Sequence, residues 1–426
     1  MRCPDARVAR DTQARLAAAE IEALALPGPP RDAPQGQDII IVPAPDGDAA
    51  PLADYAHAEG ALVSVVGLPS ARPPELGLRG LKGFSAAIAM DAPAPVLAAQ
   101  VEALTRVAVI EEERVRRMLT AHALGSAQPS APEPRKLKAL YIGAPSPAFL
   151  TLERAFSEHG GLVAAAFSSF AGFDHLHDEY FDAVVLNGAQ QSATALSLCA
   201  ALRRNASLYH LPTMVITAAG DNATTQAAFH RGAAAVAADN APSREALGWL
   251  FEAIRRERRR RAAEHDLRAL RDLMGDVRTG LFRREAFDPH LARLASEHHL
   301  TGRPLGLSVL RMMQAPGARE ADPQVWKRGF SEIASLAARL MREADCGAAI
   351  GDDVIAIALP AADLKAARRT AERIASVAEC TAFAAGDNGA GPLVFEQSAV
   401  ELQPGESGPG MLARALYALD VQAIPA

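Results

Sequence analysis

The segment FDAVVLNG, Phe181–Gly188, decides the fold of the middle of the chain, because it is a short apolar run that ends in an amide and a glycine. Two similar runs precede it, KALYIG (Lys138–Gly143) and GLVAAAF, and two follow it, PTMVITAAG (Pro212–Gly220) and AAAVAADN (Ala233–Asn240). Short apolar runs that alternate with helical patterns predict a parallel sheet covered by helices. Five strands in roughly 120 residues are typical of a flavodoxin-like domain, whose site lies beyond the carboxyl ends of the strands.

The part of the chain before this block shows a weaker form of the same alternation. Three strand-like runs and three helical patterns are expected there. The runs are Asp38–Val42, Ala61–Gly67 and Ser85–Met90, and the helical patterns are Thr12–Leu26, a segment near Pro51–Glu59, and a helix from about Pro95 to Leu124. This block is therefore also predicted to be α/β.

A linker and a long charged helix divide the chain of 426 residues into three blocks. Ala127–Pro134 is rich in proline, serine and alanine, and a helical pattern runs from about Ser243 to Met274. The predicted domains are residues 1–125, 135–262 and 275–426. The connecting helix contains the basic run RRERRRR, Arg255–Arg261, which we interpret as a solvated helix face rather than a patch for nucleic acid or a membrane.

Composition excludes several classes of protein. The formal net charge is −6, so no basic field of the whole chain favours nucleic acid or an anionic membrane. No window reaches the roughly 18 consecutive apolar residues of a membrane span, and the amino terminus has no apolar signal region. Four scattered cysteines without metal-like spacing are expected to be small buried hydrophobes in a reducing compartment. We expect a cytoplasmic protein without nucleic-acid partners, membrane insertion or a bound metal.

The middle block resembles the receiver domain of two-component signalling over its whole length. The resemblance implies a magnesium-binding pair of acids at Gly143 and Ala144, a phosphorylated aspartate at Asn187 and a lysine at Asp239. Only Thr217 matches the family's pattern. An amide cannot be the anionic nucleophile of phosphoryl transfer, so we expect a degenerate receiver. The first block resembles a still weaker receiver, with Pro43 at the phosphorylated position and Asp46 as a turn residue.

GDVRTGLFRREAF, Gly275–Phe287, opens the third block and resembles the entry sequence of GGDEF domains, the diguanylate cyclase family. The matching residues are Asp276, Thr279, Gly280, Leu281, Arg284 and Phe287. The resemblance extends to about Leu419, and receiver–receiver–GGDEF is the order of PleD-type cyclases. It implies an α/β protein of two flavodoxin-like receiver domains followed by a degenerate GGDEF domain of cyclase-like α/β fold.

The catalytic positions of the cyclase family are changed. Aligning GDDVIAIALP with the GGDEF signature places Asp352 on its second glycine and Val354 on its glutamate. By the same resemblance Arg311 stands where the first metal carboxylate is expected, Lys327 replaces a base-contacting aspartate, and Asp420 replaces a lysine. Asp353 alone cannot hold two magnesium ions. We predict no catalytic residues and no cyclase activity.

The family's product-binding site is retained. Arg342 and Asp345 reproduce its R-x-x-D motif at the family's spacing before Gly351, and Arg373 matches its third residue, an arginine on the next helix. An arginine can bond guanine O6 and N7 in a bidentate manner, and an aspartate can accept from guanine N1 and N2. We predict that these three residues bind cyclic di-GMP, against the alternative that they are surface charges.

The sequence therefore predicts a catalytically inactive cyclic di-GMP receptor, and its arrangement resembles PopA-type receptors. That resemblance implies a cytoplasmic signalling adaptor that forms a homodimer, is recruited to a cell pole and brings cell-cycle regulators to a protease. The alternatives are a ligand-independent dimerisation scaffold and a residual diguanylate cyclase.

Two further motifs are interpreted as structural. DHLHDE, Asp174–Glu179, has side chains that could hold a metal, but we predict a polar connector in a loop. The glycine-rich Ala384–Pro392 lacks the Lys and Ser/Thr of a phosphate loop and is predicted to be a turn.

Overall fold

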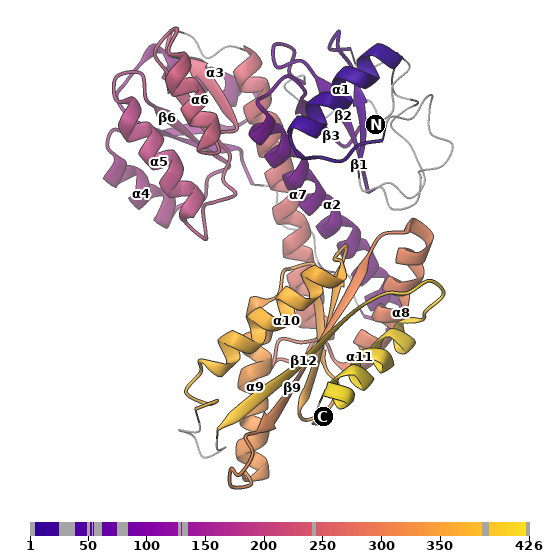
Figure 1. Ribbon diagram of the computed structural model, residues 1–426. Helices are drawn as coiled ribbons and strands as arrows, with labels where there is room; N and C mark the ends of the chain where they lie inside the picture. The colour runs from indigo at the N-terminus through magenta and orange to yellow at the C-terminus, as the bar shows by residue number, and fades with distance from the viewer. Residues whose placement is uncertain are drawn as a thin grey trace. The chain divides into compact units, whose positions relative to one another are not determined.

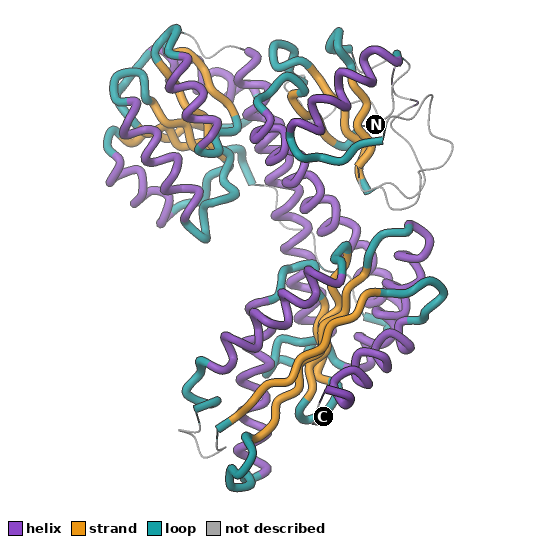
Figure 2. The backbone as a smooth tube through the Cα atoms, viewed as in Figure 1, coloured by secondary structure: helices purple, strands orange, loops and turns teal. Residues whose placement is uncertain are grey.

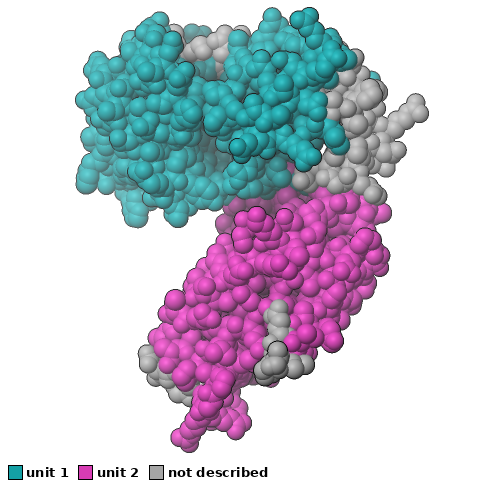
Figure 3. Space-filling view, viewed as in Figure 1, with its two compact units in different colours: residues 1–33, 38–107, 133–261 teal, residues 34–37, 108–132, 262–426 magenta. Residues whose placement is uncertain are grey.

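The computed structural model describes residues 5–24, 39–48, 52, 54, 62–74, 84–126, 129, 135–240, 244–385 and 392–422. They belong to two compact units (Figure 3). Unit 1 comprises residues 1–33, 38–107 and 133–261, and unit 2 comprises residues 34–37, 108–132 and 262–426.

The middle block forms a parallel sheet in unit 1 with strand order β5-β4-β6-β7-β8. The strands are β4 (Lys138–Ile142), β5 (Leu162–Ala166), β6 (Ala183–Asn187), β7 (Thr213–Thr217) and β8 (Ala235–Ala238). They alternate with helices α3 (Pro147–Glu158), α4 (Ser169–Asp178), α5 (Ser192–Arg204) and α6 (Asn222–His230), and α7 (Arg244–Met274) follows β8 (Figure 1). The first strand lies between the second and the third, as in flavodoxin-like sheets, so the predicted topology is confirmed.

One prediction for this block is wrong, because Asp174–Glu179 is not a loop connector. Its residues form the end of α4 and the position that follows it. The helix begins where the Ser168 side chain accepts a hydrogen bond from the backbone N–H of Ala171, at 3.1 Å. Gly172 and Leu176, four positions apart, are buried on one face of it.

The first block forms a second parallel sheet of unit 1, with β1 (Ile39–Pro43), β2 (Val63–Leu68) and β3 (Ala86–Ala89) in sequence order. The three predicted strand runs are confirmed. The last three strands of the larger sheet, β6, β7 and β8, are also adjacent in sequence order. Helix α1 (Ala6–Ala18) begins earlier than predicted, because Asp5 caps it by accepting from the backbone N–H groups of Arg7 and Val8. The helix predicted near Pro51–Glu59 falls almost wholly outside the described residues.

Two long helices contribute to both units. Helix α2 (Ala94–Ala123) has 30 residues and confirms the predicted helix, and α7 has 31 residues. Their first halves belong to unit 1 and their second halves to unit 2.

The basic run Arg255–Arg261 within α7 is not a solvated face. None of its arginines is exposed. Arg258 forms an ion pair with Asp182 at 2.8 Å, and Arg261 forms one with Glu257 at 2.6 Å. The prediction failed because three carboxylates, from α7 itself and from the residue before β6, form ion pairs with four of the six arginines.

Unit 2 contains an antiparallel sheet with strand order β10-β11-β9-β12 (Figure 2). The strands are β9 (Leu305–Gln314), β10 (Cys346–Ala349), β11 (Val354–Pro360) and β12 (Leu393–Glu401). The helices are α8 (Arg284–Thr301), α9 (Pro323–Leu340), α10 (Leu364–Glu379) and α11 (Gly408–Gln422). One core packs α8, α11 and the ends of α2 and α7 against the sheet, and a second core contains α9 and α10.

Helix α9 begins at Pro323. The Asp322 side chain accepts from the backbone N–H groups of Gln324 and Val325, and Pro323 occupies the first helical position. The predicted turn at Ala384–Pro392 lies mostly outside the described residues.

Two expectations from composition can be compared with the described residues. None of the described helices combines the length and apolar character of a membrane span. Cys199 and Cys346 are buried as expected, whereas Cys380 is exposed, which corrects the prediction for that thiol. Cys3 lies outside the described residues.

Candidate functional site

At the carboxyl end of the larger parallel sheet, Asn187 contacts the segment that follows β4. Its side-chain N–H donates to the carbonyl of Ala144 at 2.8 Å. Gly143 has a φ of +133°, and a Cβ there would lie 2.9 Å from the Cβ of Asn187. Thr217 is buried and its hydroxyl lies 3.5 Å from the carbonyl of Ala237. The contacts of these residues are structural, and Asn187 ties two strand ends together.

The positions that the cyclase resemblance gives to a metal carboxylate and a lysine hold the opposite charges here, and they contact one another. Arg311, on β9, forms an ion pair with Asp420 of α11 at 2.7 Å and lies 3.6 Å from Glu396 of the neighbouring β12. A guanidinium in place of the carboxylate opposes the binding of a cation. No cluster of three or more His, Cys, Asp or Glu side chains among the described residues is arranged to hold a metal ion.

The altered signature forms the turn between β10 and β11. The backbone N–H of Ile350 donates to the carbonyl of Val354 at 2.8 Å, which closes the turn. The indole N–H of Trp326, from α9, donates to the carbonyl of Asp352 at 3.1 Å. Val354, at the position of the signature glutamate, is the first residue of β11 and is buried. Hydrogen bonds and packing hold this turn, while its two carboxylates are exposed or half-buried.

The R-x-x-D residues form a tight turn between the end of α9 and the start of β10. The backbone N–H of Arg342 donates to the Asp345 carboxylate at 2.8 Å, and the backbone N–H of Asp345 donates to the carbonyl of Arg342 at 3.0 Å. Arg373, from α10, donates to the carbonyl of Leu340 at 2.9 Å. The structure thus brings all three predicted ligand residues to the same end of α9, with the arginines exposed and Asp345 buried.

Burial changes the acidity of Asp345. Its side chain is 6% exposed. Burial raises the pKa of this carboxyl to about 6, against the opposing effects of Arg342, through its backbone hydrogen bond and charge, and of Arg117. Asp345 therefore titrates close to neutral pH.

Arginines from two other helices hold the turn. Arg117 of α2 donates to the carbonyl of Asp345 at 2.8 Å, and Arg268 of α7 forms an ion pair with Glu343 at 2.7 Å. Arg271 of α7 also lies 4.0 Å from Glu343. Both long helices therefore contact the four-residue turn directly.

A cavity of about 240 Å³ opens beside the turn. It is lined by Arg117, Arg271, Ala338, Arg339, Met341, Arg342, Glu343 and Asp345. Four guanidinium groups face two carboxylates there, so the cavity has the character of an anion site with two acceptors. Arg373 is exposed beside this end of α9 and does not line the cavity.

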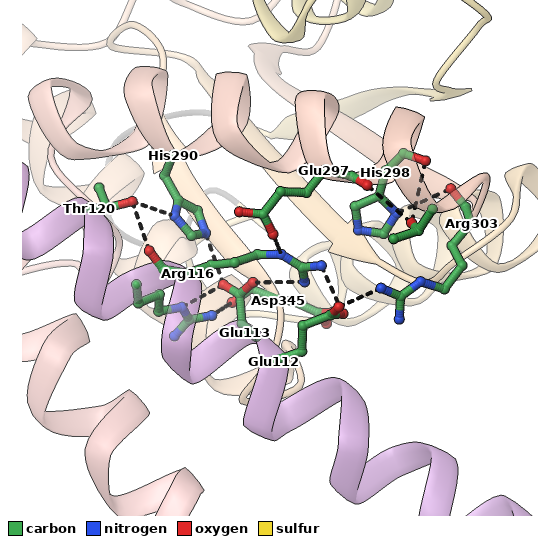
Figure 4. A network of polar contacts seen from close by, with 11 residues as sticks. Glu112, Glu113, Arg116, Thr120, His290, Glu297, His298, Arg303 and Asp345 are labelled. Atoms are coloured by element: carbon green, nitrogen blue, oxygen red, sulfur yellow. Dashed lines mark hydrogen bonds and ion pairs between the residues drawn. The ribbon is translucent and has the colours of Figure 1, made fainter. Parts of the chain in front are cut away.

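Arg117 is itself fixed by a buried polar network (Figure 4). Its Nε donates to Glu113 at 2.8 Å, and the Nε2 of His290, from α8, lies 2.9 Å from the same carboxylate. Burial alone would raise the pKa of Glu113, but the neighbouring His290 and Arg117 lower it to about 2. The same helices are joined further along by Arg116 and Glu297, whose side chains meet at 2.6 Å.

The sequence did not reveal the arginines that complete the cavity. Arg339 lies in the last turn of α9, three positions before Arg342, so its closeness to the motif could have been expected from the sequence. Arg117 and Arg271 give no local signal, because they belong to helices far away in the sequence. Arg117 and Asp345 are 228 positions apart.

No family model matches the chain, and no curated protein matches it. The chain is similar to the solved GGDEF domain of DgcB from Caulobacter crescentus in complex with c-di-GMP, with 22% identity over 35% of this chain and 86% of that chain and a TM-score of 0.29. It is also similar to the GGDEF domain of FimX from Pseudomonas aeruginosa, with 16% identity over 35% of this chain and 92% of that chain and a TM-score of 0.30. A protein described as a response regulator of Chloroflexus aurantiacus has 22% identity over 25% of this chain and 87% of its own, with a TM-score of 0.23.

Proposed function

We propose that this protein is a receptor for cyclic di-GMP that binds the ligand at the Arg342–Asp345 turn and has no cyclase activity. The observation that carries the proposal is the cavity beside that turn, which four arginines line together with Glu343 and Asp345. Cyclic di-GMP combines two negative phosphodiester groups with two guanines. The arginines suit the phosphates and guanine O6 and N7, and the carboxylate suits guanine N1 and N2.

The volume of the cavity limits how much of the ligand enters. About 240 Å³ is below the roughly 300 Å³ at which pockets for drug-sized ligands begin. One guanine with its adjoining phosphate would occupy the cavity, and the rest of the ligand would lie over the exposed Arg342 and Arg373. A second ligand molecule stacked on the first would be held outside the cavity in the same way.

The proposal that the chain is not an enzyme is supported by the contacts of Arg311. A two-metal mechanism needs carboxylates that hold the ions in line with the reacting groups. At the position of the first metal-binding carboxylate the chain has Arg311, whose guanidinium is already paired with Asp420. Restoring a metal site would require removing that cation as well as supplying the missing acids.

The role as a signalling adaptor rests on the sequence resemblance to PopA-type receptors. In this proposal the chain forms a homodimer, and its two degenerate receivers and long helices bind protein partners in the regulated proteolysis of cell-cycle regulators. Ligand at the turn would favour one of two arrangements of these helices through its different affinity for each.

Calorimetric titration of cyclic di-GMP into the full chain tests the receptor proposal. We expect micromolar or tighter binding by the parent, and Arg342→Ala should weaken it about 10- to 100-fold, the loss of one or two charge-assisted hydrogen bonds. Arg328→Ala, which changes an exposed arginine of α9 outside the cavity, is the matched control and should bind like the parent.

Three results would contradict the proposal. Lack of binding by the parent would leave a ligand-independent scaffold. Equal losses for Arg342→Ala and Arg328→Ala would show non-specific attraction of an anion. Synthesis of cyclic di-GMP from GTP and Mg²⁺ by the purified chain would show a residual cyclase.

A further inference from the structure

One face of α9 carries an open hollow of about 990 Å³ that the ligand site does not use. We call it the α9 groove. Its lining follows the helix from Gln324 to Arg339. Arg278, Thr381 and Phe383 line it from outside the helix. At 1.5 Å per residue this lining follows about 22 Å of the helix axis.

The rim of the α9 groove is strongly basic. Its charged lining residues are four cations, Arg278, Lys327, Arg328 and Arg339, and one acid, Glu332. Arg278 has an acidic partner, Asp276, at 3.1 Å. Among the described residues, no carboxylate forms an ion pair with any of the other three cations. This concentration of positive charge stands on a chain whose formal net charge is −6.

The floor of the α9 groove is formed by small side chains and some apolar surface. Ser331 and Ser335, four positions apart, leave room between the basic side chains, and the half-buried Leu336 supplies apolar surface. Phe383 is fixed against Gly329, where a Cβ would lie 1.4 Å from the ring. A hollow with an apolar floor and a cationic rim is complementary to a helix that has apolar residues on one side and acids beside them.

We infer that the α9 groove is a docking surface for an acidic amphipathic segment of a partner protein. Its length matches a helix of about 15 residues, about four turns. A nucleic acid fits less well, because the net negative charge of the chain opposes a long polyanion more strongly than a short segment that carries a few acids. The aromatic ring of the groove is also buried rather than available for stacking on bases. The inference goes beyond the receptor proposal and does not depend on it.

Fluorescence anisotropy of the full chain without cyclic di-GMP provides the test. The probe is a labelled helical peptide of about 15 residues with glutamates on one face and leucines on the other. We expect saturable, salt-sensitive binding that Lys327→Glu combined with Arg328→Glu weakens at least about tenfold, because reversal of two charges replaces attraction by repulsion. This pair leaves untouched Arg339, which lines both the groove and the cavity of the Arg342–Asp345 turn.

The matched control reverses a Lys and an Arg on α10, Lys365→Glu with Arg368→Glu, which are exposed and do not line the hollow. The control should bind the peptide within about twofold of the parent after correction for net charge. An equal loss in both pairs, or no binding by the parent, would overturn the inference. Equal binding of a polyglutamate without leucines would remove the role of the apolar floor, and tighter binding of an oligothymidylate would show a nucleic-acid surface instead.

Discussion

Lowering the pH from about 7.5 to about 5 should weaken the binding of cyclic di-GMP about tenfold, because Asp345 must be ionised to accept two hydrogen bonds from guanine. Burial raises the pKa of this carboxyl to about 6. About one carboxyl in 11 is then ionised at pH 5 and nearly all are at pH 7.5, a difference of about 1.4 kcal/mol in binding free energy. Since the charged form binds, affinity rises as the pH rises through 6.

The other groups around this carboxyl keep their charge over that range. Arg342 is on the same turn, and Arg117 reaches it from α2. Both guanidinium groups remain protonated. Glu113, whose pKa is lowered to about 2, remains ionised, and burial raises the pKa of the Cys346 thiol so that it stays neutral. The pH dependence is therefore assigned to Asp345.

Calorimetry in buffers of different ionisation enthalpy would measure both the affinity and the protons released on binding. The parent should release close to one proton per binding event at about pH 5 and almost none at about pH 7.5. Asp345→Asn should bind more weakly with a flat profile. A flat profile for the parent, or the same slope in Asp345→Asn, would refute the assignment.

Three further changes test the packing of unit 2 by thermal or urea unfolding. Glu113→Gln should lower the free energy of unfolding by about 3 kcal/mol, since it leaves buried cations without their counter-charge. The control Glu102→Gln, at an exposed position of the same helix, should change it by less than about 0.5 kcal/mol. Equal effects of the two substitutions would contradict the buried network. Gly329→Ala should cost about 1–3 kcal/mol because the new methyl group meets a packed aromatic ring, and an unchanged melting temperature would show that the ring moves freely. Arg311→Asp and Asp420→Arg should each destabilise, while the double swap should recover about 0.5 kcal/mol, the value of a partly exposed pair; strictly additive effects would show that the two side chains do not interact.

The strands of the larger parallel sheet could be predicted because a buried parallel strand is recorded in its own sequence as an unbroken apolar run. FDAVVLNG and its four counterparts needed no distant information. Arg342 and Asp345 could be located because they match a short family motif, and the structure places them in a turn whose hydrogen bonds join residues three positions apart. Local patterns predict local structure.

Charged residues were the main source of error, because their surroundings depend on segments far away in the sequence. The basic run in α7 was interpreted as solvated, although Arg258 is paired with Asp182, 76 positions away. No local sequence pattern predicts the hydrogen bond from Arg117 to the carbonyl of Asp345. The loop predicted at Asp174–Glu179 failed differently: its histidines and acids lie on the outer side of a helix whose buried side is only Gly172 and Leu176.

Helices α2 and α7 both contact the Arg342–Asp345 turn. A fragment of the chain that lacks one of these helices therefore lacks some of these contacts. A fragment that begins at Arg135 retains Arg268 against Glu343 but loses Arg117, and with it the hydrogen bond to the backbone of Asp345. Such a fragment would have a differently shaped cavity beside the turn, even though residues 1–125 contribute no strand to the sheet of unit 2. Modules recognised in the sequence are therefore not independent parts here, and exchanging residues 1–125 for a domain of another protein would also replace Arg117, which lines the cavity.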